Sequence, residues 1–329
     1  MKVILNKETS PHLNLATEEY LLSFCKDEDI VMLWRNDRSV IIGQNQNAYR
    51  EVRLDYAKEK GISVVRRLTG GGAVFHDLGN INFTYITDYK NGDFGNYKTF
   101  AEPICQFLKG FGLSASVSGR NDIEADGFKI SGNAQTVKGN RILYHGTLLY
   151  SADMRSLADV LSPSKSKFED KAVNSVRARV KNINQLCETG LSAEEFMIDL
   201  YKFFLEKEGA IDYSFSESEL KEIKKISREK YESWEWNFAA SPNCNTKREQ
   251  KFPFGLVCAD IEVSKGVIKA INLSGDFFGR LSIDELCCAL VGVKFDENEV
   301  FNVLNRMNID DYISGATAED LNKLIFKNE

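Results

Sequence analysis

Long hydrophobic runs, paired cysteine motifs and an excess of basic residues are all missing from this sequence of 329 residues. The N-terminal stretch MKVILNKETSPHLNLATEEYLL interrupts every apolar run with polar residues within a few positions. It therefore contains neither a signal-peptide core nor a membrane span. We expect a cytoplasmic protein that does not associate with a membrane.

Cysteine and histidine are too scattered to predict a metal site. The seven cysteines include no C-x-x-C pair, and the three histidines, His12, His76 and His145, lie on distant segments. The formal net charge of −6 argues against a nucleic-acid-binding protein, because affinity for a phosphate backbone comes from clustered lysine and arginine. One local basic stretch could steer an acidic partner domain or could be an ordinary solvated surface. It comprises Lys165, Lys167, Lys171, Arg177, Arg179 and Lys181.

The chain is long enough for two domains, and its 43% hydrophobic and 27% charged residues are typical of a globular protein. A hydrophilic break at 242–250 predicts a boundary between a large domain, 1–242, and a small C-terminal domain, 250–329. The spacing of apolar residues predicts helices at 15–26 and 99–111, and strands at 29–34, 39–43, 62–67 and 81–85.

The most unusual stretch is RRLTGGGAVFHDLGN, which runs from Arg66 to Asn80 between two predicted strands. Three consecutive glycines allow a backbone to approach a ligand closely, and the paired arginines favour an anionic one. The stretch is not a Walker loop, because no lysine follows Gly72. It is not a dinucleotide fingerprint either, because Phe75 stands where that motif needs glycine.

A second polar segment opens with Lys129. The sequence KISGNAQTVKGNRILYHGTLLYS predicts a hairpin that turns at Gly139–Asn140 and pairs Asn133 with Gly146. Strict alternation would place Lys129, Ser131 and Asn133 on one face, which suits the wall of a ligand site better than an apolar core. A lysine of ordinary pKa, about 10.4, acts there as a charged donor and not as a nucleophile.

The two histidines near these segments are expected to be structural. His76 is interpreted as a partly buried imidazole bonded to Asp77 or to a backbone group, not as a general base. His145, in the middle of its strand, is interpreted as orienting the groups around it.

Several blocks along the whole chain, in this order, resemble lipoate-protein ligases of the A type. They are RRLTGGGAVFHDLGN, SGRND (118–122), KISGNAQ (129–135), HGTLL (145–149), SVRARVKN (175–182) and WEWNF (234–238). The resemblance implies an α+β fold: a large domain similar to biotin ligases and class II aminoacyl-tRNA synthetases, with a mixed sheet flanked by helices, and a small α+β C-terminal domain that moves.

The implied chemistry uses ATP and Mg²⁺ to convert lipoate into lipoyl-AMP, and then transfers the lipoyl group to a lysine of an acceptor protein. The implied acceptors are lipoyl domains of 2-oxoacid dehydrogenase complexes or the glycine-cleavage H protein. The resemblance also implies site residues. Lys129 would be catalytic, the contacts to ATP and lipoyl-AMP would be Arg67, Gly72, Ala73, Val74, Phe75 and Lys129, and those to lipoate Lys129, Gly71, His76 and His145. Asn121 and Asp122 would lie near Lys129, and the resemblance does not identify the Mg²⁺ ligands.

Two alternatives remain. An octanoyl- or lipoyltransferase of the same superfamily would need a cysteine thiolate, yet no cysteine lies between Cys105 and Cys187. A lipoate-binding protein without catalysis would not need both Arg67 and Lys129, because an apolar acyl tail requires neither charge.

Overall fold

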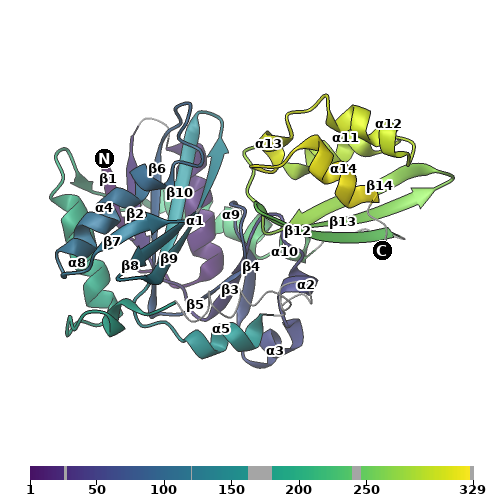
Figure 1. The fold of residues 1–329 in the computed structure, drawn as a ribbon. Coiled ribbons are helices and arrows are strands. Elements are labelled where there is room, and N and C mark those ends of the chain that lie inside the picture. Colours follow the sequence, from purple (N-terminus) through teal and green to yellow (C-terminus); the bar gives the residue numbers. More distant parts are fainter. Residues whose placement is uncertain (26–27, 120, 162–179, 239–245, 327–329) are drawn as a thin grey trace.

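Alternating side chains build the central sheet of the computed structural model, which describes residues 1–25, 28–119, 121–161, 180–238 and 246–326. In β2 (Ile30–Trp34), Val31 and Leu33 face one core, and Ile30, Met32 and Trp34 face another. Eight strands follow the order β11-β1-β2-β6-β10-β9-β8-β7 (Figure 1). Strand β1 is parallel to both of its neighbours and the other pairs are antiparallel, so the sheet is mixed. The other strands are β1 (Lys2–Leu5), β6 (Asn80–Asp88), β7 (Ala115–Ser118), β8 (Asp122–Ala125), β9 (Phe128–Lys138), β10 (Arg141–Leu149) and β11 (Ile211–Asp212).

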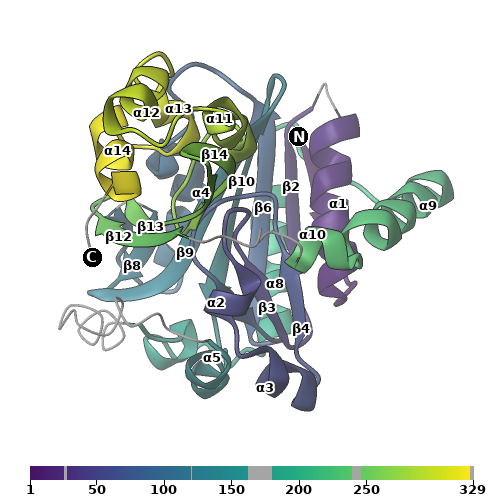
Figure 2. The same cartoon turned by 90° about the vertical axis from the view of Figure 1, so that its right-hand side faces the viewer.

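Helices cover both faces of this sheet (Figure 2). On one face α1 (Pro11–Phe24) and α9 (Glu217–Ile226) pack over Met32 and Trp34. On the other face α4 (Tyr97–Lys109) and α8 (Ala193–Leu205) pack over Leu33. Helix α4 buries the apolar stripe that the sequence pattern indicates for 99–111.

A second sheet of three strands carries the glycine-rich stretch. Its order is β4-β3-β5, and the glycines lie between β4 (Ser63–Arg66) and β5 (Val74–His76). Strand β3 (Ser39–Ile42) turns Ile41 toward α1, whereas Val40 and Ile42 face a separate core. That core lies against α2 (Ala48–Glu51), α3 (Leu54–Glu59) and α5 (Met154–Val160).

The C-terminal part has its own core, formed by a three-stranded sheet and four helices among its described residues. Strand β12 begins at Thr246, so the hydrophilic tetrad 247–250 forms a sheet edge and not a connector. Residues 242–245 of the expected break lie outside the described residues. The elements are β12 (Thr246–Phe252), β13 (Gly255–Ser264), β14 (Val267–Gly275), α11 (Ile283–Leu290), α12 (Glu297–Leu304), α13 (Ile309–Tyr312) and α14 (Ala318–Phe326).

The described part of the large domain is completed by η1 (Ile183–Gln185), η2 (Ser227–Tyr231) and α10 (Trp234–Phe238). The predicted hairpin is confirmed: β9 and β10 flank Gly139–Asn140, and Asn133 pairs with Gly146. The first helix begins at Pro11 after the cap Ser10, earlier than the predicted start at residue 15. None of the helices described is both long enough and apolar enough to span a bilayer.

Candidate functional site

A pocket of about 200 Å³ lies between the eight-stranded sheet and the β4-β3-β5 sheet. Its apolar wall comes from Leu15 of α1, Trp34 of β2 and Ile41 of β3. Residues of β5, β6, β9 and β10 and of the loops that precede β5 and β8 provide the rest. They are Arg67, Gly71, Gly72, Ala73, Val74, His76, Asn82, Asn121, Lys129, Gly132, Asn133, Ala134, His145, Gly146 and Thr147, with Phe278 from the C-terminal part.

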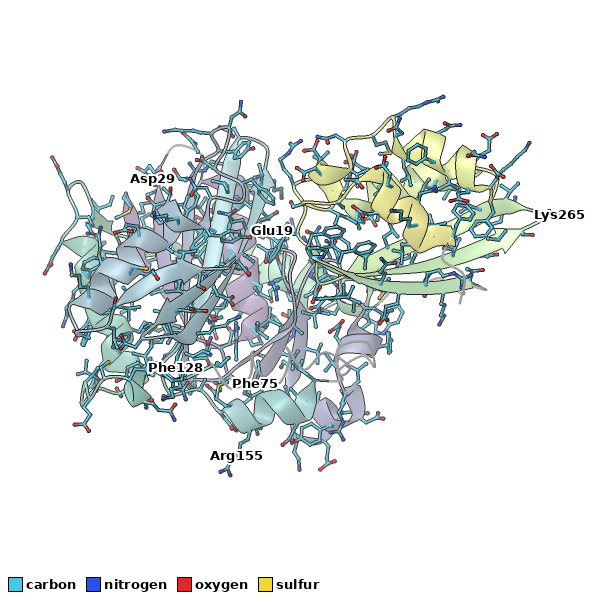
Figure 3. The ribbon with its side chains drawn as sticks, viewed as in Figure 1. Glu19, Asp29, Phe75, Phe128, Arg155 and Lys265 are labelled. Carbon is cyan, nitrogen blue, oxygen red and sulfur yellow. The ribbon has the colours of Figure 1, made fainter. Side chains whose placement is uncertain are left out.

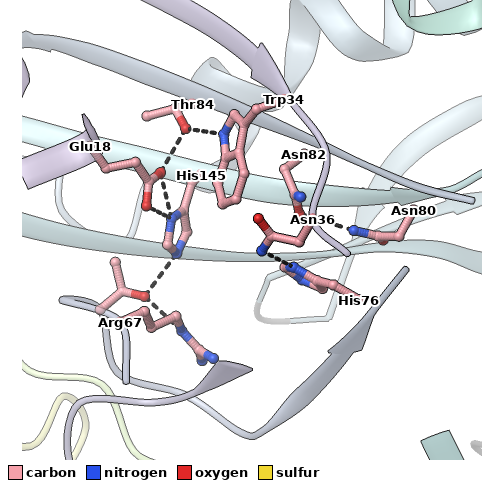
Figure 4. Close-up of polar contacts among 10 residues, drawn as sticks. Glu18, Trp34, Asn36, Arg67, His76, Asn80, Asn82, Thr84 and His145 are labelled. Atoms are coloured by element: carbon pink, nitrogen blue, oxygen red, sulfur yellow. Dashed lines mark hydrogen bonds and ion pairs between the residues drawn. The ribbon is translucent and has the colours of Figure 1, made fainter. Parts of the chain in front are cut away.

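His145 belongs to a chain of buried polar groups (Figure 4). Its Nδ1 lies 2.9 Å from Glu18 Oε1, and its Nε2 lies 2.8 Å from the Thr69 hydroxyl oxygen. The same Glu18 oxygen accepts a 2.6 Å hydrogen bond from Thr84, which in turn accepts one from Trp34 Nε1. Both ring nitrogens of His145 are therefore engaged, which supports the expectation that this residue orients its neighbours.

Arg67 holds the glycine run in shape. Its Nη2 donates to the carbonyl oxygens of Gly70 and Gly72 at 2.7 and 2.9 Å, and its Nε donates to Thr69. Burial lowers the pKa of Arg67 to about 10, so the guanidinium stays charged at neutral pH. Because these donors already meet the carbonyl oxygens of their own chain, Arg67 fixes the loop in this conformation.

Arg66 has a similar structural role. Each of its guanidinium nitrogens donates to backbone carbonyl oxygens, including those of Gly43, Trp236 and Asn237. The pairing of arginines in the sequence suggests an anion, but this side chain joins β4 to α10 instead. The WEWNF block is thereby tied to the glycine-rich stretch.

The glycine run also contacts the C-terminal part. Gly71 has φ = +93°, and its N–H donates to the Phe277 carbonyl oxygen at 3.2 Å. A Cβ at Gly71 would lie 2.9 Å from the ring of Phe278, whereas a Cβ at Gly72 would meet nothing within 4 Å. Open space at Gly72, on the pocket wall, is where a ligand can approach the backbone.

Lys129 is 30% exposed and lies at the polar end of the pocket, where its Nζ is 2.8 Å from Asp122 Oδ1. The expectation that Lys129, Ser131 and Asn133 share a face is wrong. The pairing of β8 with β9 shifts between Ile123 and Glu124, which leaves Ile130 as an extra residue. Lys129 consequently lies beside Gly132. Ser131 instead donates to Asn133 on the opposite face of the sheet.

His76 lies deep in the pocket and is only 4% exposed. The expectation that it bonds to Asp77 or to a backbone group is wrong, because its Nδ1 lies 3.1 Å from Asn36 Nδ2 and the Asp77 carboxylate accepts from the N–H groups of Gly79 and Asp153. Burial, followed by the charges of Arg67 and His145, lowers the pKa of His76 to about 3. The imidazole is therefore neutral at physiological pH.

The pocket brings together Arg67, the backbone from Gly71 to Val74, His76, Lys129 and His145, all of which the sequence interpretation had selected. Phe75 is different, because its ring packs with Val160 of α5 in the core beneath the small sheet (Figure 3). Only the backbone of Phe75 could therefore face a ligand.

Sequence reasoning missed Glu18, Trp34, Asn36, Thr69 and Asn82. Glu18 was detectable, because Leu15, Glu18 and Leu22 share the buried stripe of one helix and a carboxylate there needs a partner. The others gave no local signal, since their partners lie on strands distant in sequence. In the part of the chain that the structure describes, no cluster of three His, Cys, Asp or Glu side chains could hold a metal ion.

Comparison with known proteins decides the family. A model of the lipoyl protein ligase A/B catalytic domain matches residues 10–205, and one of the bacterial lipoate protein ligase C-terminus matches residues 241–325. The chain belongs to the lipoyl protein ligase A/B family.

Similar family members span almost the whole chain. Lipoate-protein ligase LplJ of Bacillus subtilis is 40% identical over 96% of this chain and 97% of its own length. Lipoate–protein ligase 1 of Staphylococcus aureus is 37% identical over 99% of this chain and 100% of its own length.

Solved structures of the lipoyl protein ligase A/B family are similar in fold to this chain. LipL1 of P. falciparum in complex with lipoate has a TM-score of 0.78 and 28% identity, covering 94% of this chain and 95% of its own. A lipoate-protein ligase A bound with ATP has a TM-score of 0.62 and 30% identity, covering 72% of this chain and 97% of its own. The expected α+β fold, with a mixed sheet flanked by helices and a small C-terminal domain, is confirmed.

Proposed function

We propose that this chain is an ATP-dependent lipoate-protein ligase. The observation that carries the proposal is one pocket with an apolar wall of Leu15, Trp34 and Ile41 that also contains Lys129 and an open glycine backbone. Such a pocket suits an acyl chain that ends in a carboxylate beside a phosphate.

The reaction has two balanced steps. A carboxylate oxygen of lipoate attacks the α-phosphorus of ATP, the bond to the β-phosphate bridging oxygen breaks, and pyrophosphate leaves with that electron pair. The ε-amine of an acceptor lysine then attacks the acyl carbonyl of lipoyl-AMP. AMP leaves, the amine loses a proton to solvent, and an amide remains.

In this proposal Lys129 is the catalytic residue and acts as an electrostatic clamp. A carboxylate and a triphosphate repel each other, and an ammonium between their oxygens offsets the repulsion and stabilises the charge that develops at the α-phosphate. The ion pair of Lys129 with Asp122 supports this role, because it holds the ammonium at the edge of the pocket before any substrate binds.

The same proposal assigns the remaining site residues. Arg67, Gly72, Ala73, Val74, Phe75 and Lys129 contact ATP and lipoyl-AMP, and Lys129, Gly71, His76 and His145 contact lipoate. Their common place around the pocket supports the assignment for every member except the ring of Phe75. Arg67 would contribute mainly by holding the glycine backbone open.

Mg²⁺ would accompany the triphosphate. Mg²⁺ sites often use one or two carboxylates together with substrate phosphates, so a dedicated cluster of acidic residues is not required. Asp122, adjacent to the pocket residue Asn121 and paired with Lys129, is the carboxylate that fits. The ion would neutralise phosphate charge.

We propose lipoyl domains of 2-oxoacid dehydrogenase complexes, or the glycine-cleavage H protein, as acceptors, and a cytoplasmic location. One family member with 31% identity and a TM-score of 0.65 is described as a bi-partite ligase with its E2 lipoyl domain, from Thermoplasma acidophilum. All members of the basic stretch except Lys181 lie outside the described residues, so its docking role stays a prediction.

The transferase alternative is weaker. No cysteine lines the pocket among the residues the structure describes, and burial raises the pKa of the Cys105 thiol to about 11. A thioester mechanism needs the opposite shift. The charged pair of Lys129 and Asp122 also favours the ligase over a binding protein without catalysis.

Intact-mass analysis of a purified lipoyl domain tests this proposal. With lipoate, ATP and Mg²⁺ the domain should gain one lipoyl group on its acceptor lysine. No gain should occur without ATP or with that lysine changed to arginine. Modification that proceeds equally without ATP, from an acylated donor protein, would instead support the transferase.

A further inference from the structure

His76 presents two different nitrogens to its surroundings. Nδ1 lies against Asn36, whereas Nε2 is buried and has no hydrogen-bond partner among the described residues. His76 also lines the pocket, on the same face of β5 as Val74. A buried polar atom without a partner in a native site calls for an explanation.

Neighbouring amides fix the proton on this ring. Asn14 Nδ2 lies 3.0 Å from the Glu8 carbonyl oxygen and 2.9 Å from that of Arg35, so this atom is the amide nitrogen and not the oxygen. It donates to Asn36 Oδ1 at 2.8 Å, which turns Asn36 Nδ2 toward His76.

An amide nitrogen is only a donor, and Nδ1 of His76 must therefore accept. A neutral imidazole carries one proton, which leaves it on Nε2. The lowered pKa of His76 agrees with a neutral ring. Consequently the buried atom without a partner is an N–H donor.

A second amide lines the same pocket. Asn82 also lines the pocket, and its Nδ2 has no partner among the described residues, while its Oδ1 accepts from Asn80. Figure 4 shows Asn36, His76, Asn80 and Asn82 together on one side of Trp34, apart from the chain that joins Glu18 and His145. This side offers uncharged hydrogen-bonding groups, whereas the ammonium of Lys129 is available for anionic oxygens.

We infer that the Nε2–H of His76, held in this tautomer by Asn36, is a specificity-determining donor for an uncharged acceptor atom of the bound substrate. The acceptor is a ring nitrogen or hydroxyl oxygen of the nucleotide, or the acyl carbonyl oxygen. Asn36 is a positioning residue, because it acts through His76. The inference rests on the proposed function for the identity of the substrates.

Nitrogen-15 NMR of histidine-labelled protein tests the tautomer without reference to activity. The ring signals that disappear in His76→Gln identify His76, and they should show a protonated Nε2 and an unprotonated Nδ1. Asn36→Asp keeps the shape but replaces the donor with an acceptor, so the proton should move to Nδ1 or the ring should gain a second one. A wild-type ring protonated at Nδ1 alone overturns the inference.

Calorimetric binding to ATP alone, lipoate alone and a non-hydrolysable lipoyl adenylate analogue tests recognition. His76→Asn places its amide near the Nδ1 position and lacks the far donor, and should weaken binding of at least one probe about tenfold, or about 1.4 kcal/mol. His76→Gln places an amide N–H near the Nε2 position and should recover most of that loss.

The probe that responds identifies the source of the acceptor. A loss with ATP indicates the nucleotide, a loss with lipoate indicates the acyl substrate, and a loss with the analogue alone indicates the activated intermediate. Equal binding by wild type, His76→Asn and His76→Gln overturns the inference. If wild type binds none of the probes, the proposed function fails instead.

Discussion

Lys129 has a carboxylate within hydrogen-bond distance in the structure, and this pairing determines what its replacement should do. The ion pair with Asp122 is about one-third exposed at both ends, so solvent screens it and it adds little to stability. Removing Lys129 should therefore affect chemistry much more than folding.

We predict that Lys129→Ala lowers lipoate-dependent pyrophosphate exchange about 10²- to 10³-fold, the usual effect of losing one preorganised donor. Lys129→Arg should also be impaired, since a planar fork does not replace a compact ammonium. Lys138→Ala, at the exposed end of the same strand, is the matched control and should exchange normally. Near wild-type exchange by Lys129→Ala would contradict the clamp.

His76 predicts a specific dependence of stability on pH. Its pKa is about 3 in the folded chain against an ordinary value of 6.5, so the unfolded chain binds a proton that the folded chain does not between these values. The free energy of unfolding should fall as the pH drops below about 6.5, by about 2 kcal/mol at about pH 5. His76→Gln should lose this part of the dependence in urea denaturation at several pH values. Identical pH profiles for the two proteins would show that His76 titrates normally.

At the scale of elements, local sequence patterns predicted the strands and the hairpin that depend on neighbouring residues. Short apolar runs located β2, β3 and β4, alternation located β6, and a polar two-residue turn located the β9–β10 hairpin. The β-bulge at Ile130 could not be predicted, because it depends on pairing with β8. The burial of the Phe75 ring was equally invisible, since β5 is a strand of three residues whose outer face is covered by α5.

The residues of the candidate site also divide into those with a local sequence signal and those without one. The glycines, Arg67 and Lys129 gave a signal because their residue types are unusual in their places. Glu18, Asn36 and Thr69 act through partners that only the fold brings near. Sequence thus identified the residues of the proposed ligand site more readily than the residues that hold them in place.

The glycine run allows a test that separates folding from binding. A Cβ at Gly72 meets nothing within 4 Å, so Gly72→Ala should leave the free energy of unfolding unchanged or raise it by less than about 1 kcal/mol. It should still weaken ATP binding tenfold or more, because it fills the space next to the ligand. Gly43→Ala is the contrasting variant: its Cβ would lie 2.0 Å from the Gly71 carbonyl oxygen, and about 1 to 3 kcal/mol of stability should be lost. Unchanged ATP affinity in Gly72→Ala would remove this backbone from the nucleotide site.

On the scale of the whole molecule, the C-terminal part packs against the pocket and the glycine run. Gly71 donates to Phe277, Gly275 donates to the Asn45 carbonyl oxygen, and the ring of Phe278 forms part of the pocket wall. A ligand bound at the glycine run would lie beside these contacts and would compete with them. Lipoyl-AMP is a mixed anhydride that water hydrolyses, which gives closure over the site a chemical purpose.

Small-angle scattering should detect the resulting rearrangement. We predict that the radius of gyration and the distance distribution change when lipoate and ATP are added together, and change little with either alone. Phe278→Ala, which removes a ring from the contact, should shift the profile of the free protein toward that of the loaded one. Superimposable profiles under all conditions would show that the two parts do not move.

The central claim is that lipoate is activated as an adenylate in this pocket, and ATP–pyrophosphate exchange tests it most directly. Labelled pyrophosphate should enter ATP when lipoate is present, should not do so when lipoate is left out, and should need no acceptor protein, because the first step is reversible by itself. Absence of exchange in folded protein that binds both lipoate and ATP would contradict the account.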